Sequence, residues 1–268
     1  MSDSKRLLET AREAARAGAR VLAGFAPGEL TVEAKKSFDY VTQADRLAQE
    51  AVLGVIRRRH PDHHILAEES ADRAFAAKEQ EGVLWVVDPL DGTTNFIHGF
   101  PHYAVSVAAL EHGRLAAGVV LDVTRNEEFY ARAGGGAWLG DQPLAVSPPG
   151  RPERALLLTG FPFRDKDRLE RYLELFAEIF GQVSGVRRAG AAALDLAYVA
   201  AGRAEGFWEL GLAPWDTAAG ILLVREAGGM VTDFDGGDMC LWRGDVVAAA
   251  PWIHGLLQGP CGRCFPGG

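Results

Sequence analysis

The sequence predicts a layered α/β fold in which helices and sheets stack on one another. Three observations support this prediction. The first 60 residues show the apolar periodicity of two helices, residues 103–133 alternate strand-like segments with turn residues, and helices and strands alternate from residue 155 onward. Because helices and sheets of this kind each have one apolar face, they must cover one another in layers.

The composition is that of an ordinary globular protein. Of 268 residues, 48% are hydrophobic and 24% charged, which allows a sizeable core in one or two domains. The net charge of −8 argues against direct nucleic-acid binding and would repel an anionic substrate unless metal ions reversed the local sign. We find no membrane-spanning run, no signal-peptide core and only three cysteines, so we expect a cytoplasmic protein without membrane contact.

Two helices are predicted first. Residues 4–25 place leucine, alanine and valine on one face, which is typical of a packing helix. Residues 35–45 are expected to form a loop that runs into a second helix, with the basic residues 57–59 at its C-terminus. Thr42 is a candidate N-cap with Asp45 three residues later, close to a capping box. Helix capping alone would explain Asp45.

The most informative stretch begins with a buried strand, Val83 to Val87, which ends in Asp88 and Asp91. A buried strand has no structural need for two carboxylates so close together, and a cation is the simplest remedy for their repulsion. Pro89 would hold the turn stiff. Asp88, Asp91 and the Leu90 carbonyl would then face one point, and three oxygen ligands suit Mg²⁺.

The next residues indicate a phosphate site. Gly92 lets the backbone approach a ligand closely, and residues 93–95 would open a helical turn whose free amides attract anions. Carboxylates that hold metal ions beside a phosphate cradle indicate phosphoryl transfer to water. The alternative is a polar turn with an aspartate cap on a short helix, which a lone Asp-x-x-Asp would favour.

Two further carboxylates stand at the ends of predicted elements. A short strand, Ile65 to Ala67, runs into Glu68, where a carboxylate could complete an ion's shell or take a proton from water. A solvated loop is the simpler interpretation of Glu68 alone. A helix predicted over residues 214–227 places Asp216 in its first turn, where it could cap the helix or bind a metal.

The remaining elements divide the chain at a proline-rich boundary. Before it lies an N-terminal half, residues 1–147, whose strands would form an antiparallel meander; after it lies a C-terminal half, residues 148–268, which includes Asp216. The predicted elements are strands 103–110, 114–121 and 127–133, then strand 155–159, helix 168–180, strand 183–188, helix 190–201 and strand 205–210. The Cys261-x-x-Cys264 pair lacks a second pair and is a weak zinc signal, so we expect a frayed end.

Four segments together resemble the inositol monophosphatase family of Mg²⁺-dependent, lithium-sensitive phosphatases, and most of all its bacterial members. The segments are Asp39–Asp45, Glu68–Ser70, Trp85–Phe96 and Trp215–Gly220. The third, W-V-V-D-P-L-D-G-T-T-N-F, is highly specific. The resemblance implies a five-layer α-β-α-β-α sandwich of the type shared with fructose-1,6-bisphosphatase, a site between the two halves, and a homodimer.

The resemblance also implies roles for individual residues. Two or three Mg²⁺ ions would be held by Glu68, Asp88, the Leu90 carbonyl, Asp91 and Asp216. Thr93 and Glu68 would orient the attacking water, and Asp45 would support Thr93. The amides of Gly92 and Thr93 would hold the phosphate, and the leaving group would contact Ala192, Glu209 and Asp216. Ala191 stands where some members have a hydroxyl residue, which leaves the sugar contacts open.

The function implied is hydrolysis of myo-inositol 1-phosphate and related polyol phosphates by metal-activated water. Close alternatives are fructose-1,6-bisphosphatase, 3′-phosphoadenosine phosphate phosphatase and histidinol-phosphate phosphatase activities. A non-catalytic alternative is a regulator associated with RNA polymerase, as some bacterial relatives are. A metal-binding scaffold without turnover is a third possibility, against which the complete set of carboxylates argues.

Overall fold

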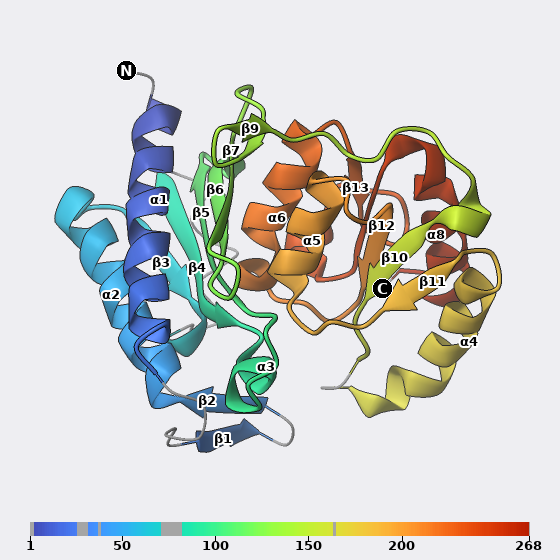
Figure 1. Ribbon diagram of the computed structural model, residues 1–268, viewed down its shortest axis with the longest axis horizontal. Coiled ribbons are helices and arrows are strands. Elements are labelled where there is room, and N and C mark those ends of the chain that lie inside the picture. Colours follow the sequence, from blue (N-terminus) through green and yellow to red (C-terminus); the bar gives the residue numbers. More distant parts are fainter. Residues whose placement is uncertain (1–2, 26–31, 37–38, 71–81, 163–164, 268) are drawn as a thin grey trace.

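The computed structural model describes residues 3–25, 32–36, 39–70, 82–162 and 165–267 (Figure 1). It confirms the five-layer α-β-α-β-α sandwich. One outer layer is a pair of helices, the central layer is a second pair, and the other outer layer is a third, with a sheet in each space between (Figure 1). The first outer pair is α1 (Asp3–Leu22) and α2 (Gln43–Arg59). The central pair is α5 (Ala192–Ala200) and α6 (Pro214–Glu226). The other outer pair is α4 (Leu169–Phe180) and α8 (Pro251–Cys264).

The first sheet has seven strands in the order β3-β4-β5-β6-β7-β8-β9. β3 pairs parallel with β4, and every later pair is antiparallel, so the predicted meander is confirmed. The strands are β3 (His64–Ala67), β4 (Val83–Asp91), β5 (Ala104–Glu111), β6 (Arg114–Asp122), β7 (Glu127–Arg132), β8 (Ala137–Leu139) and β9 (Gln142–Pro143).

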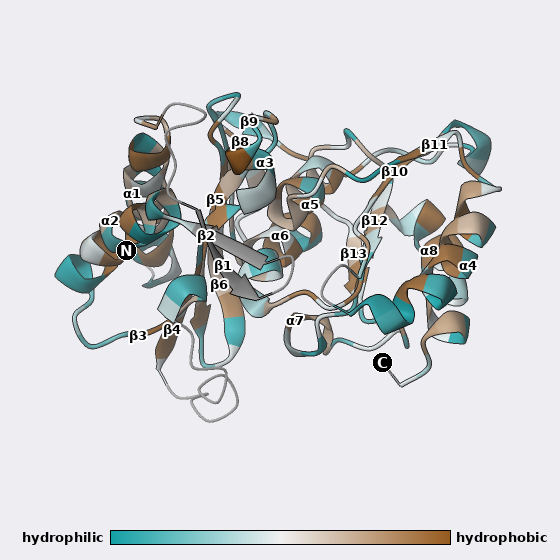
Figure 2. Ribbon diagram, turned by 90° about the horizontal axis from the view of Figure 1, so that it is seen from below, coloured by the Kyte–Doolittle hydropathy of each residue, from teal (hydrophilic) through white to brown (hydrophobic). Residues whose placement is uncertain are grey.

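Side chains on β5 show why this sheet is covered on both faces. Val105, Val107 and Ala109 belong to the core formed with α1 and α2, whereas Ala104 and Ala108 belong to the core formed with α5 and α6. Successive side chains of a strand point to opposite faces, so a strand buried on both sides is mostly apolar, and Ser106 is the buried polar exception on β5. Figure 2 shows the resulting concentration of apolar residues along these strands, with hydrophilic residues in the outer loops.

The second sheet has five strands in the order β11-β10-β12-β14-β13. β10 pairs parallel with both β11 and β12, and β14 pairs antiparallel with β12 and β13. The strands are β10 (Leu156–Thr159), β11 (Gly185–Arg187), β12 (Gly206–Glu209), β13 (Met230–Thr232) and β14 (Val246–Ala249). Shorter helices are α3 (Thr93–Ile97), α7 (Cys240–Arg243), η1 (Glu68–Ser70), η2 (Pro152–Arg154) and η3 (Lys166–Arg168).

Two local predictions near the N-terminus and the central motif are wrong. Residues expected to form a loop instead form the antiparallel hairpin of β1 (Val32–Lys36) and β2 (Asp39–Thr42). The alternation of Val32, Glu33, Ala34 and Lys35 is the short strand signal that the loop prediction overlooked. The strand predicted to end at Val87 continues as β4 to Asp91, through a register shift rather than a turn.

The C-terminal prediction is also wrong. The segment expected to fray forms the end of α8, and the Cys261 side chain is completely buried against the second sheet's outer core. Burial raises the pKa of the Cys261 thiol well above its ordinary value, so this cysteine is a core residue rather than a reactive one. In the part of the chain described, no helix combines the length and apolarity needed to cross a membrane.

Candidate active site

The central motif lies in a β-bulge at the end of β4. Asp88 pairs with Ser106 and Asp91 with Ala104, so β4 has one more residue than β5 over this interval. The extra residue reorients the strand end and brings both carboxylates toward the central helices. Asp88 is 1% exposed and accepts a hydrogen bond from the Leu90 amide at 3.0 Å. The bulge, rather than a turn stiffened by Pro89, therefore positions the two aspartates.

Asp91 connects this bulge to the second half of the chain. Its Oδ2 accepts a hydrogen bond from the Ala193 amide, in the first turn of α5, at 2.8 Å. Asp216 occupies the equivalent place on α6, where its Oδ2 accepts from the Ala213 amide at 2.7 Å. Each carboxylate thus satisfies a free amide at a helix start. Asp216 lies in the first helical turn, as predicted.

Four carboxylates share one electrostatic environment. The pKa of Asp88 is raised well above its ordinary value by burial first, and then by the negative charges of Glu68, Asp91 and Asp216. The pKa of Asp91 is raised in the same direction by burial and by Asp216. These residues come from β3–η1, β4 and α6, so the fold gathers acidic groups that are distant in sequence. That these residues form one metal site stays a prediction.

The carboxylates do not form a finished coordination sphere. In the described segments, no three aspartate, glutamate, histidine or cysteine side chains already lie at the spacing of a formed metal site. Burial and neighbouring negative charges raise the pKa of Asp88, and the Asp91 and Asp216 carboxylates are each hydrogen-bonded to a backbone amide. The donors are nevertheless hard oxygen atoms only, which is the chemistry that Mg²⁺ prefers.

Asp45 both caps α2 and contacts the Thr93 hydroxyl. Its Oδ2 accepts from the Thr42 amide at 2.8 Å and from the Thr42 hydroxyl at 2.5 Å, which completes a capping box on α2. Its Oδ1 lies 2.9 Å from the Thr93 hydroxyl oxygen. The same hydroxyl lies 3.1 Å from the Leu90 carbonyl oxygen. Asp45 is fully buried, so it links the start of α2 rigidly to the start of α3.

Gly92 fits its position for two reasons. Its φ of +93° lies in the left-handed region that side chains disfavour. A Cβ atom there would also lie 3.0 Å from the His102 carbonyl oxygen and 3.3 Å from the Ala191 Cβ. The backbone therefore turns sharply between the bulge and α3, which begins at Thr93. The predicted helical turn after Gly92 is confirmed.

Sequence reasoning missed the residues that hold this turn against α5. The side-chain amide nitrogen of Asn95 lies 2.7 Å from the His102 carbonyl oxygen and 2.9 Å from the Ala189 carbonyl oxygen. The His102 ring lies 3.3 Å from the buried Asp195 carboxylate on α5. Asn95 was visible in the motif, but its partner is 94 positions away, and no local pattern reveals such a contact.

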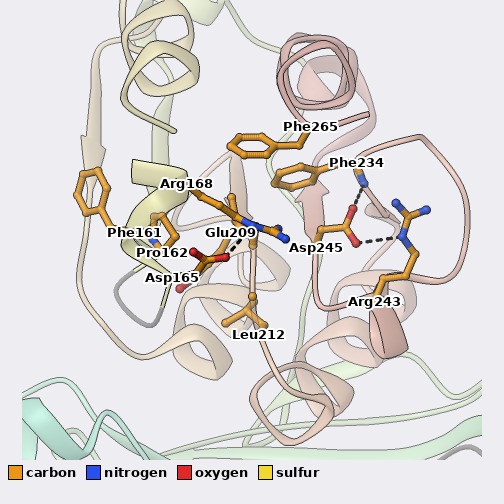
Figure 3. Close-up of a pocket in the computed structure, with 12 residues that line it drawn as sticks. Phe161, Pro162, Asp165, Arg168, Glu209, Leu212, Phe234, Arg243, Asp245 and Phe265 are labelled. Atoms are coloured by element: carbon orange, nitrogen blue, oxygen red, sulfur yellow. Dashed lines mark hydrogen bonds and ion pairs between the residues drawn. The ribbon is translucent and has the colours of Figure 1, made fainter. Parts of the chain in front are cut away.

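The predicted leaving-group contacts lie on α5 and β12. Ala192 is the first residue of α5, and Glu209 is the last residue of β12; each is 7% exposed. The pKa of Glu209 is raised well above its ordinary value by burial and by Asp195, and Arg188 opposes this shift. Glu209 also lines a cavity of about 260 Å³ with Phe161, Arg168 and other residues (Figure 3).

The five layers, the bulge at the end of β4 and the acidic residues on β4 and α6 together define a layered α/β protein with an acidic site between its two sheets. A sequence profile of the inositol monophosphatase family matches residues 3–259. The chain belongs to this family.

Individual relatives agree with this assignment. The Nus factor SuhB of Pseudomonas aeruginosa is 53% identical over 223 residues, which cover 82% of this chain and 81% of that protein. The extragenic suppressor protein suhB of Bartonella henselae has a crystal structure that matches with a TM-score of 0.86 and 39% identity, over 97% of this chain and 98% of that one. The inositol monophosphatase of Anabaena sp. PCC 7120 matches with a TM-score of 0.84 and 38% identity, over 99% and 98%.

Proposed function

We propose that this protein hydrolyses phosphate monoesters of polyols, myo-inositol 1-phosphate among them, with Mg²⁺ as its cofactor. The observation that supports this most directly is the shared environment of Glu68, Asp88, Asp91 and Asp216. Asp88 and Asp91 are buried and their pKa values are raised, and such carboxylates are costly unless a cation or a proton compensates them. A phosphatase of this family needs a cation at this place, since the family generally depends on Mg²⁺.

The proposed metal ligands are all oxygen atoms from the described segments. They are the carboxylates of Glu68, Asp88, Asp91 and Asp216 and the Leu90 carbonyl, for two or three ions. When bound, Mg²⁺ supplies positive charge that offsets the developing charge on the phosphate and makes a coordinated water more acidic. The raised pKa values of Asp88 and Asp91 fit this set, because a cation would restore the ionised forms.

The remaining residues are assigned to binding and orientation. The Thr93 hydroxyl donates to Asp45, which leaves its lone pairs able to accept a hydrogen bond from a water held with Glu68. The amides of Gly92 and Thr93 are assigned to the phosphate oxygens. Ala192, Glu209 and Asp216 are assigned to the alcohol, with Glu209 as an acceptor for hydroxyl groups. No protein nucleophile is required, because water attacks the phosphorus directly.

A substrate panel tests this proposal. Purified protein is supplied with myo-inositol 1-phosphate, fructose 1,6-bisphosphate, 3′-phosphoadenosine 5′-phosphate or histidinol phosphate, with and without Mg²⁺ and Li⁺. We expect phosphate release to require Mg²⁺, to be inhibited by Li⁺ and to be fastest for the polyol monoester. A clear preference for another ester would replace the substrate, and no release from any ester would overturn the proposal.

A second candidate function follows from the name of the curated relatives, which are called Nus factors. This name suggests a regulatory role, for which the alternative considered above is action together with RNA polymerase. An Asp91→Asn variant, expected to lose hydrolysis, separates the two functions. If this variant restores the phenotype of a deletion strain, hydrolysis is not the physiological role; if it does not, the phosphatase activity is required.

We also propose a cytoplasmic homodimer whose ligand is a small phosphate ester. Family membership supports this assembly, and the net charge of −8 disfavours direct contact with nucleic acid or an anionic membrane. Light scattering coupled to size-exclusion chromatography measures the mass directly. A mass equal to that of the single chain, 28.8 kDa, would contradict the dimer.

A further inference from the structure

The two parallel strands β10 and β12 place Gly160 beside Glu209. Their register pairs Leu157 with Gly206, Leu158 with Phe207 and Thr159 with Trp208. One step further along both strands, Gly160 is the neighbour of Glu209, at the carboxyl edge of the sheet. Neighbouring residues on paired strands direct their side chains to the same face, a few ångströms apart. Any side chain at position 160 would therefore compete for space with Glu209.

The competition is severe. A Cβ atom at position 160 would lie 2.0 Å from both Cδ and Oε1 of Glu209 and 2.2 Å from its Oε2. These separations are far below van der Waals contact, so the Glu209 carboxylate occupies the volume that a side chain would fill. The backbone of Gly160 is not in the left-handed region. Space for the carboxylate, rather than an unusual φ, is therefore what requires glycine here.

The carboxylate so placed is suited to a ligand. Glu209 is 7% exposed and, within the described segments, accepts no hydrogen bond from any donor. A buried carboxylate without donors is unfavourable, and a hydroxyl group of a bound alcohol would satisfy it. Glu209 lines the cavity of about 260 Å³ shown in Figure 3, and its pKa responds to the charges of Asp91 and Asp216. It thus lines an accessible cavity and is within electrostatic reach of two proposed metal ligands.

We propose that Gly160 is a positioning residue that determines selectivity for hydroxyl-bearing leaving groups, because it leaves room for the Glu209 carboxylate beside the site. This inference rests on the proposed function and extends it to the choice of alcohol. A methyl group at position 160 displaces the end of a flexible side chain rather than backbone. The fold therefore tolerates the change, while the carboxylate moves away from the hydroxyl that it would accept.

The first test compares two esters. In Gly160→Ala, the ratio of kcat/KM for myo-inositol 1-phosphate to that for phenyl phosphate, which lacks hydroxyl groups on its alcohol, is expected to fall about tenfold or more, the effect of losing a hydrogen bond to a charged group. The matched control is Gly255→Ala, in α8, where nothing lies within 4 Å of the added Cβ. The control should leave both rates unchanged. An unchanged ratio in Gly160→Ala would overturn the proposal.

The second test is a double-mutant cycle with Glu209→Ala, which removes the carboxylate and frees its volume. In that background, Gly160→Ala should cause no further loss of selectivity and no loss of Tm, since the two changes act through one contact. Additive losses would overturn the proposal. If Gly160→Ala alone fails to fold, restored folding in the double variant supports the contact, and continued failure refutes it.

The Tm values of the double-mutant cycle also distinguish a failure of this proposal from a failure of the proposed phosphatase function. Hydrolysis of neither ester by the native protein would overturn the phosphatase assignment. The Tm values of the cycle would still decide whether Gly160 and Glu209 compete for space, because they require no activity. Coupled Tm values support the positioning role of Gly160, and independent ones refute it.

Discussion

The Thr93 hydroxyl lies 2.9 Å from the Asp45 carboxylate, a residue 48 positions earlier in the chain that also caps α2. One side chain therefore fixes the start of a packing helix and the orientation of a candidate catalytic hydroxyl. This arrangement makes the geometry of the site depend on the outermost helical layer. It also allows the two roles of Asp45 to be separated by mutation.

We expect Asp45→Ala to lower kcat about 10- to 100-fold with little change in KM, because Thr93 loses the acceptor that orients it. The same variant should lose about 1–2 kcal/mol of unfolding free energy through the broken capping box. Thr42→Ala is the matched control, since it removes the cap but leaves the contact between Asp45 and Thr93. Steady-state kinetics and urea unfolding measure both effects. A loss of kcat in Thr42→Ala equal to that in Asp45→Ala would contradict this division of roles.

Metal removal provides a second prediction. The pKa values of Asp88 and Asp91 are raised in the folded protein, mainly by burial, so without a cation the folded state binds more protons than the unfolded state. The unfolding free energy of the chelated protein should therefore fall as pH rises from about 4, the ordinary pKa of an aspartate. Saturating Mg²⁺ should remove this decline and raise stability by about 2.7 kcal/mol at a concentration 100 times Kd.

Asp91→Asn tests the origin of that effect. It removes one of the repelling charges and keeps an oxygen that can accept from the Ala193 amide. We expect a higher Tm than the native protein in EDTA, and a smaller increase on adding Mg²⁺. Asp141→Asn, at an exposed position, is the control and should behave like the native protein. Equal Mg²⁺ responses in Asp91→Asn and the native protein would exclude Asp91 as a ligand.

The sequence could predict the layers because each rests on a local pattern. The apolar periodicity of α1 and the alternation of strands and turns from β5 to β7 define elements that must bury one face. The bulge in β4 could not be predicted, because it depends on how β4 pairs with β5, and the sequence of one strand does not contain its register. The segment 83–91 instead suggested a strand followed by a turn.

Some residues of the candidate site could also be predicted from the sequence, whereas others could not. Asp88 and Asp91 stand out because carboxylates are anomalous in a buried strand, whereas the contacts of Asn95 and the space at Gly160 arise only from the tertiary fold. The Cys261 prediction failed for a related reason. Glycine and proline around it suggested a loose end, but the apolar face of α8 packs on the second sheet and outweighs those weak helix formers.

A third prediction concerns acid stability through Asp122, a fully buried residue at the end of β6. Burial alone would raise its pKa, but hydrogen bonds from Thr124 and Arg125 outweigh burial and lower the pKa below its ordinary value. A carboxyl whose folded pKa is lowered stabilises the protein above its unfolded pKa and loses that contribution as pH falls through the folded pKa.

The native protein should therefore lose stability as pH falls below about 4, and Asp122→Asn should lose less over the same interval. At neutral pH the variant should be about 1–3 kcal/mol less stable, because the charge-assisted bonds to Thr124 and Arg125 are weakened. Urea unfolding at a series of pH values measures both. Parallel pH profiles for the two proteins would show that Asp122 does not contribute to acid unfolding.

The final prediction concerns the contact between α3 and the segment that precedes α5. The Asn95 amide nitrogen lies near the carbonyl oxygens of His102 and Ala189, so it must act as a donor in this position. Asn95→Asp keeps the shape but replaces the donor by an acceptor that faces the same oxygens. We expect a loss of about 1–3 kcal/mol in unfolding free energy, as for a half-buried polar group whose hydrogen bonds are lost.

Activity should fall with stability in Asn95→Asp, because α3 begins at Thr93 and α5 begins at Ala192, and both residues are assigned to the proposed site. Thr94→Ala, an exposed neighbour on α3, is the control and should change unfolding free energy by less than about 0.5 kcal/mol. Urea unfolding and phosphate release measure the two effects. If Asn95→Asp were as stable as Thr94→Ala, the carbonyl oxygens would not depend on the Asn95 donor, and the link between the two segments would have to come from the contact of His102 with Asp195.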